Sequence, residues 1–197
     1  MKQFEKLLAV AVVLLATSVF AETATWNIDT AHSAAQFTVR HMGISNVNGV
    51  FTKTTGTAQL DESDVTKSSV DAVIDATSVD TRVEARDADL KSDHFFDVAK
   101  YPTLTFKSKK IVKNGDKLGV IGDLTIHGVT REVTLDSDGL TPAVTDPWGN
   151  TRRGFTATTK INRQDFGLKW GNALTSGELV VGDEVKISLD IEMVKKK

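Results

Sequence analysis

Apolar and polar residues alternate with a period of two along most of this chain, and this pattern constrains the fold more than any other feature. It is clearest near the C-terminus, where Val185, Ile187, Leu189, Ile191 and Met193 alternate with polar or charged residues. Successive side chains of a β-strand point to opposite faces, so each such segment has one apolar and one polar face. Antiparallel sheets with one face in water have this pattern. We therefore expect an all-β protein.

About eight segments of this kind follow one another, separated by turn signals. Asn114-Gly115 predicts a tight hairpin between two of them. So many short strands indicate a closed antiparallel barrel or a sandwich, and closure would leave no edge strand exposed. Besides the last strand, the alternating segments are 35–40, 70–76, 103–107, 118–126, 132–136 and 155–161.

One segment departs from the strand pattern and predicts a short helix. Thr81 and Glu84 have the spacing of a capping box, in which a hydroxyl and a carboxylate bind the first free amides of a helix. We expect this helix to run to Lys91, with a further helical turn over residues 93–98.

The N-terminus resembles a secretory signal. Lys2 and Lys6 precede an unbroken apolar run over residues 7–16, and Val19 and Ala21 are small or apolar residues at the positions that a signal peptidase reads. We expect residues 1–21 to be cleaved and residues 22–197 to form one domain in the periplasm. The apolar run is too short to span a membrane, so no stable membrane insertion is expected.

Composition narrows the function. The formal charge of −2 and the lack of a basic patch beyond Lys195–Lys197 argue against nucleic-acid binding, and the chain has no cysteine for disulfides, thiol catalysis or zinc fingers. The four histidines lack local metal-site spacing, and no nucleophile elbow, P-loop or dinucleotide motif is present. We therefore predict no catalytic residue, no metal and no cofactor.

Two segments combine aromatic rings with arginines. Residues 146–155 contain Trp148, Arg152 and Arg153, and residues 161–170 contain Arg163 and Trp170. Rings beside guanidinium groups suit a ligand with an apolar body and an anionic end. The alternative is structural, with Arg163 paired to Asp165 and a packed tryptophan.

His32 and His41 flank the first long strand. Each could contact a ligand head group, or each could be a structural histidine. The strand pattern also leaves open whether a barrel of this size is filled by side chains or holds a slender ligand.

Several motifs resemble the YceI-like family of bacterial periplasmic proteins. The N-terminal part contains Trp26-Asn-Ile-Asp-Thr-Ala-His-Ser33 and Phe37-Thr-Val-Arg-His41. The centre contains Tyr101-Pro-Thr-Leu-Thr-Phe106 and Gly122-Asp-Leu-Thr-Ile-His-Gly-Val-Thr130, and the last third contains Ile161-Asn-Arg-Gln-Asp-Phe-Gly167. The resemblance extends in order over residues 22–197.

The resemblance implies an extended eight-stranded, lipocalin-like antiparallel barrel with one or two short helices and a long apolar pore. It also implies a long-chain isoprenoid or fatty-chain lipid as ligand, and a homodimer as one arrangement. On this basis the protein is predicted to bind or carry such a lipid. The alternatives are an enzyme that modifies an isoprenoid lipid and a filled barrel that acts as a stress or surface factor.

Residues for the two parts of such a site follow from the alternation and from the aromatic–arginine segments. The ligand head group is predicted to meet Arg152, Arg153, Arg163, His32 and His41. The pore is predicted to be lined by Phe37, Phe51, Phe106, Leu118, Val120, Leu124, Ile126, Phe155, Phe166, Trp170 and Ile187.

Overall fold

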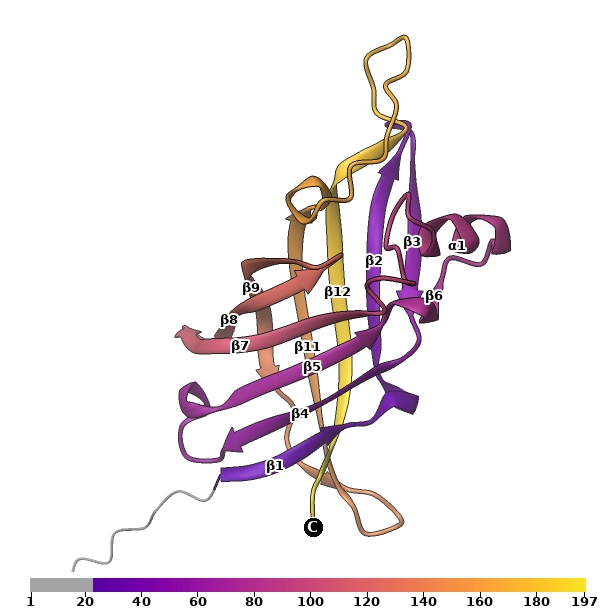
Figure 1. Ribbon diagram of the computed structural model, residues 1–197. Helices are drawn as coiled ribbons and strands as arrows, with labels where there is room; N and C mark the ends of the chain where they lie inside the picture. The colour runs from indigo at the N-terminus through magenta and orange to yellow at the C-terminus, as the bar shows by residue number, and fades with distance from the viewer. Residues whose placement is uncertain (1–22) are drawn as a thin grey trace, which may run out of the picture.

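The computed structural model describes residues 23–197, and nearly all of its regular structure is antiparallel strand (Figure 1). The signal peptide expected over residues 1–21 lies outside the described residues. Within residues 23–197, no helix is long and apolar enough to cross a membrane. The strands are β1 (Thr23–Ile28), β2 (Ala34–His41), β3 (Ser45–Phe51), β4 (Thr54–Asp61), β5 (Ser69–Asp75), β6 (Val79–Asp80), β7 (Thr103–Asn114), β8 (Lys117–Ile126), β9 (Val129–Leu140), β10 (Val144–Thr145), β11 (Thr151–Asn162) and β12 (Val181–Lys195).

Eight of these strands close into the predicted antiparallel barrel. They follow the order β11-β9-β8-β7-β5-β4-β1-β12, and the pairing of β12 with β11 completes the ring. The hairpin predicted at Asn114-Gly115 joins β7 to β8. Closure pairs both edges of these barrel strands, so the fold class expected from the alternation is confirmed.

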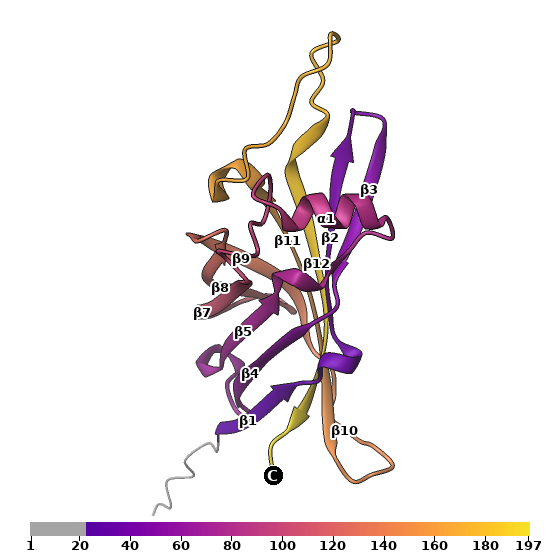
Figure 2. The same ribbon diagram turned by 45° about the vertical axis from the view of Figure 1, so that its right-hand side comes forward.

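Strand β12 is long enough to pair with two strands on its other side. Its C-terminal end pairs with β1, and its residues 181–190 pair with β2. Strands β3 and β6 continue the sheet beyond β2. Figures 1 and 2 show that β2, β11 and β12 follow the long axis of the molecule, whereas β4, β5 and β7 cross it.

The residues discussed for the site lie near the two ends of this long axis. The upper end contains His41, Arg163 and Val181, and the lower end contains Trp26 and Arg152. The remaining short elements are α1 (Glu84–Lys91) and the 3-10 turns η1 (Thr30–His32), η2 (Val65–Lys67), η3 (Ala76–Ser78) and η4 (Arg163–Phe166).

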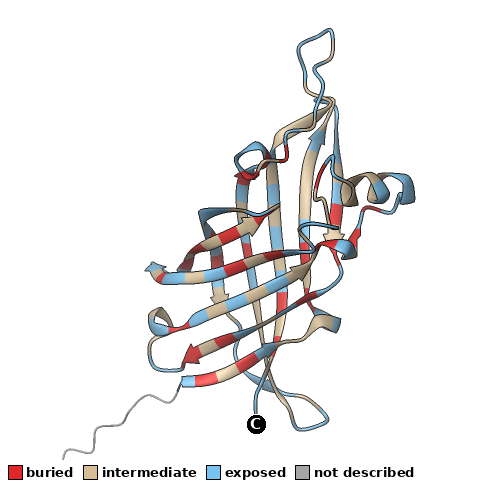
Figure 3. Ribbon diagram, viewed as in Figure 1, coloured by how far each residue is buried: buried red, intermediate tan, exposed pale blue. Residues whose placement is uncertain are grey.

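Burial follows the alternation of the sequence. Buried and exposed positions alternate along many of the strands in Figure 3. On β8, Leu118, Val120, Leu124 and Ile126 are all buried, as their common face predicts. Between them, Gly122 leaves room for the Phe106 ring, which lies where a Cβ atom would stand. The inward faces therefore form two hydrophobic clusters along the barrel, and the one that contains Trp26 and Met193 lies at the lower end.

The capping box predicted for the helix is wrong. Helix α1 begins at Glu84, and its N-cap residue Val83 makes no side-chain cap hydrogen bond. The Thr81 hydroxyl instead donates to the Asp87 carboxylate at 2.6 Å and accepts from Arg86 Nε at 2.7 Å. Thr81 is buried, so these contacts serve to attach the helix to the end of β6. Residues 93–98 form turns rather than a further helix.

Candidate functional site

The barrel contains an apolar cavity of about 220 Å³. It extends from Val39 and Val181 near the upper end to Leu60 and Met193 near the lower end. Most lining residues are aliphatic or aromatic, and the polar ones are Gln36, Thr54, Ser68, Ser69, Thr159 and Arg163. The interior is therefore partly hollow rather than filled, and its surface suits a hydrocarbon chain.

The strand alternation places most of the predicted pore residues on this cavity. All five apolar residues of β12 from Val185 to Met193 line it, because the strand stays regular over that whole length. Nine of the residues predicted to line the pore do so: Phe37, Phe51, Phe106, Leu118, Val120, Leu124, Ile126, Phe155 and Ile187.

Phe166 and Trp170 are not among the lining residues, although Arg163 and Leu168 of the same segment after β11 are. Phe166 is fully buried at the end of η4. Trp170 stacks on Phe95, with ring centroids 5.3 Å apart, and Phe95 is the ring that faces the cavity. The two rings come from separate loops and pack against each other near the upper end.

Arg163 is a buried structural residue of the upper end, with only 3% of its surface exposed. Its five N–H donors all have acceptors: the carbonyl oxygens of Leu168, Trp170, Val181 and Gly182, and the Asp183 carboxylate at 3.0 Å. Burial lowers the pKa of this guanidinium, and Asp183 opposes that shift. Arg163 thus joins the loop after η4 to the start of β12. Its ion-pair partner is Asp183, not the Asp165 that the sequence suggested.

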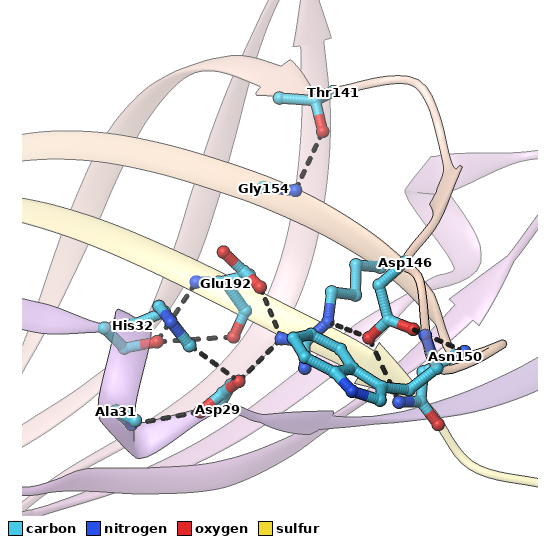
Figure 4. Close-up of polar contacts among 11 residues, drawn as sticks. Asp29, Ala31, His32, Thr141, Asp146, Asn150, Gly154 and Glu192 are labelled. Carbon is cyan, nitrogen blue, oxygen red and sulfur yellow. Dashed lines mark hydrogen bonds and ion pairs between the residues drawn. The ribbon is translucent and has the colours of Figure 1, made fainter.

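Arg152 lies at the lower end, where it forms ion pairs with three carboxylates. Figure 4 labels these carboxylates, which belong to Asp29, Asp146 and Glu192. It donates to Asp146 at 2.7 Å, to Asp29 at 2.6 Å and to Glu192 at 2.5 Å. These hydrogen bonds, led by the one to Asp146, raise the pKa of Arg152. In turn Arg152, with His32 as the second contributor, lowers the pKa of Asp29 to about 2.

The predicted head-group residues are therefore divided between two ends of the barrel. His32 Nδ1 lies 3.0 Å from Asp29 and belongs to the Arg152 cluster. His41 pairs with Val181 at the opposite end of β2, close to the Arg163 end. Arg152 and Arg163 stand near opposite ends of β11. A single head group could not meet the whole predicted set.

Arg153 is the arginine of the set that projects inward at the lower end. It lies directly opposite Met193, so the two side chains share one face of the sheet. Its guanidinium carbon lies 5.5 Å from the centre of the Trp26 ring, and its Nη2 is 3.0 Å from Glu62. Arg153 Nε and Trp26 Nε1 are both buried without a hydrogen-bond partner. Two buried N–H donors, one on Arg153 and one on Trp26, therefore have no acceptor.

Sequence reasoning did not single out Phe95 as a residue of the cavity wall, or Trp26 as the buried neighbour of Arg153. Trp26 starts one of the quoted family motifs, and its position between polar residues on the first strand marks it as inward-facing. Phe95 lies in an irregular loop, where alternation carries no information.

A metal-ion site at the lower end is not supported. Asp29, His32 and Glu192 offer donor atoms within 4.8 Å of one another. Arg152 already donates to both carboxylates and supplies the positive charge there.

Comparison with known proteins agrees with this geometry. A relative from Escherichia coli O157:H7, named Protein YceI, is 39% identical over 166 residues, covering 84% of this chain and 83% of the relative. The crystal structure of Burkholderia cenocepacia BcnA has a TM-score of 0.70 at 25% identity, covering 84% of this chain and 98% of BcnA. A polyisoprenoid binding domain from Saccharophagus degradans shares the fold, with a TM-score of 0.64 at 16% identity and coverage of 88% and 99%. The YceI-like domain model matches residues 26–193, and the chain therefore belongs to the YceI-like domain family.

Proposed function

We propose that this protein binds and carries a long-chain isoprenoid or a similar amphiphilic lipid in the barrel cavity. The observation that carries the proposal is the cavity itself, which is lined along the barrel by apolar side chains from most of the barrel strands. The fold shared with a polyisoprenoid binding domain supports the same ligand class.

The energetics suit a ligand that is mostly hydrocarbon. Burying one CH₂ group contributes about 0.8 kcal/mol, so a chain that fills the cavity needs few polar contacts. The volume of 220 Å³ is below the roughly 300–1,000 Å³ of sites for drug-sized ligands. A long chain therefore has to widen the cavity by moving side chains such as Phe37, Phe51 and Phe96, which pack against one another on its wall.

We place the polar end of the ligand beside Arg153 and Trp26 at the lower end. Their two unpaired buried donors would gain an acceptor, such as a phosphate or hydroxyl oxygen. The new hydrogen bonds would remove the free-energy cost of burying these donors without a partner. Arg152 and Arg163 serve as structural residues in this scheme.

The proposal also places the protein in the periplasm, after cleavage near Glu22. N-terminal sequencing of periplasmic material would test this, and a retained Met1 would contradict it.

Cavity binding is tested by adding the same bulk at three positions. Ala72 lines the cavity, Val73 is the next residue on β5 and is 40% exposed, and Ala157 is buried but absent from the cavity wall. Ala72→Phe should abolish lipid retention in native mass spectrometry with little change in the stability of the lipid-free protein. Val73→Phe should change neither property. Ala157→Phe should destabilise the protein by about 1–3 kcal/mol, because it overpacks a core.

The same measurement separates the alternatives. A co-purifying lipid that remains intact on incubation supports a carrier, and conversion to a new species supports an enzyme. Absence of lipid in the wild type, with Ala72→Phe as destabilising as Ala157→Phe, would show a filled barrel.

The head-group position is tested with two ligands that share a hydrocarbon chain. Arg153→Gln should weaken binding of a polyprenyl phosphate about tenfold and leave a neutral polyprenol nearly unaffected, because a charge-assisted hydrogen bond contributes roughly 1.5–3 kcal/mol. Trp26→Phe, which removes the Nε1 donor and keeps a ring, should have a smaller effect in the same direction. Equal losses of affinity for the two ligands would show that Arg153 has a structural role and does not contact the head group.

A further inference from the structure

The hairpin of β10 and β11 carries an exposed tryptophan at the lower end of the molecule. Strand β10 stands at the edge of the sheet and pairs with β11 over only two residues. The loop between them projects past the barrel, on the same side as the C-terminus (Figures 1 and 2). Trp148 in this loop is 78% exposed, and Val144 at the base of the hairpin is 59% exposed.

The loop backbone is held in one conformation that leaves the indole outside. The Asp146 carboxylate accepts hydrogen bonds from the backbone N–H groups of Trp148 at 2.9 Å and Asn150 at 2.8 Å. It also accepts from the Asn150 side chain at 3.0 Å and from Arg152, which is itself fixed by Asp29 and Glu192 (Figure 4). The hydrogen bonds to Asp146 thus fix the turn in a conformation that leaves the Trp148 side chain exposed to solvent.

A run of three lysines lies next to this hairpin. Lys195, Lys196 and Lys197 are exposed, and none of them forms an ion pair within residues 23–197. Val194 pairs with Arg152, so the lysines continue past the point where the hairpin leaves the barrel. The Lys196 N–H donates to the Thr25 carbonyl at 2.8 Å, which fixes the tail against β1. Asp29, Asp146 and Glu192 at this end pair with Arg152, and Glu62 pairs with Arg153.

We propose that this end of the protein docks reversibly on lipid bilayers with anionic head groups, through Trp148 and Lys195–Lys197. Tryptophan favours the membrane–water interface because its ring is apolar and its N–H is polar. Lysines near a bilayer are attracted to anionic lipids within about a Debye length. An aromatic anchor combined with basic residues is the arrangement by which proteins lie on a membrane without crossing it.

The shape of the surface favours a bilayer over a protein partner. A stable protein interface buries about 800 Å² on each side and has an apolar centre. Here one indole stands on a narrow loop, and the other exposed apolar residues beside it, such as Val144 and Pro147, are small. A fluid lipid surface can close around such a tip, whereas a protein would need a matching pocket.

The test is co-sedimentation with lipid vesicles. It uses the protein purified in the form that its host produces. Vesicles of phosphatidylcholine alone are compared with vesicles of phosphatidylcholine and phosphatidylglycerol in equal parts. We expect binding to the anionic vesicles that weakens as salt rises. Brominated lipids should quench the fluorescence of the wild type and not that of Trp148→Phe, because Trp26 is buried in the barrel and Trp170 lies at the upper end.

Matched variants identify the surface. Trp148→Ala and the triple change of Lys195, Lys196 and Lys197 to Gln should each weaken vesicle binding about tenfold. The control for Trp148 is Ile44→Ala, because Ile44 is 77% exposed at the opposite end. The control for Lys195–Lys197 is a triple variant in which Lys110, Lys113 and Lys169 are replaced by Gln. It removes the same amount of charge from other exposed positions. Neither control should alter binding.

Docking is overturned if the wild type does not bind anionic vesicles, or if the controls reduce binding as much as the test variants. It is also overturned if Trp148→Ala instead dissociates a dimer in sedimentation velocity, since the occupant would then be a second copy of the chain. Trp148 and the lysines do not line the cavity, so these variants should retain the wild-type content of bound lipid. Failure of docking and failure of the carrier function are therefore distinguishable.

Discussion

The two ends of the barrel are each stabilised by an arginine, but the acceptors differ in kind. Arg163 at the upper end donates mainly to backbone carbonyl oxygens, and Arg152 at the lower end donates to three carboxylates. Carbonyls do not titrate and carboxylates do. The upper end should therefore hold its structure over a wide pH range, whereas the lower end should weaken in acid.

Removing Arg163 should have the largest effect. Arg163→Ala would leave four carbonyls without this donor in a buried site and Asp183 with Gln164 as its remaining donor, and loss of one partner of a buried ion pair costs about 3–5 kcal/mol. Chemical denaturation should show this loss. Arg163→Lys should rescue little, because one ammonium group cannot reproduce the five-donor fork. If Arg163→Ala lowers the free energy of unfolding no more than Arg152→Gln does, the two ends do not differ in stability as expected.

Arg152→Gln should have a smaller effect that depends on pH. At neutral pH it would leave three carboxylates facing one another, and we expect a melting temperature lower by about 5 °C. The deficit should shrink in acid as those carboxylates take up protons. Thermal melts of wild type and variant at matched pH would show whether the curves converge.

The wild type itself should lose stability over a defined acid window. Asp29 has a folded-state pKa of about 2 against an ordinary value of 3.8, so its contribution is fully present above about pH 4 and is lost as pH falls toward 2. The pKa of Asp146 is also lowered, chiefly by Arg152, and adds in the same direction. NMR titration of the Asp29 carboxyl should follow this midpoint in the wild type and a higher one in Arg152→Gln, where His32 still lowers the pKa of Asp29. An unshifted Asp29 in the wild type would contradict the prediction.

The smallest expected effect concerns the aromatic pair of Phe95 and Trp170 near the upper end. Trp170→Leu would remove the ring that stacks on Phe95, and an aromatic pair contributes about 0.5–1.5 kcal/mol beyond its buried area. Stability should fall by about that amount, and exchange of a bound fluorescent lipid should become faster. Unchanged exchange would mean that ligands do not pass this end.

The strand segments show how much of the fold could be predicted. Residues 185–193 alternate without interruption, and their apolar members line the cavity as expected. In residues 118–126 Gly122 interrupts the inward face, but Leu118, Val120, Leu124 and Ile126 still point inward. The prediction failed at Thr81, Phe166 and Trp170, which lie outside regular strands. There the direction of a side chain depends on contacts with distant residues, such as Phe95 for Trp170.

The alternation along the sequence predicts the all-β class and the inward faces of the strands, because a period of two encodes side-chain direction locally. The family follows from the sequence motifs, not from the alternation. Only the tertiary structure decided which arginines are structural, since the partners of Arg152 and Arg163 come from strands and loops far apart in the chain. It also decided that a cavity remains inside the barrel. Cavity volume depends on how side chains from most of the strands pack against one another, and no single segment contains that information.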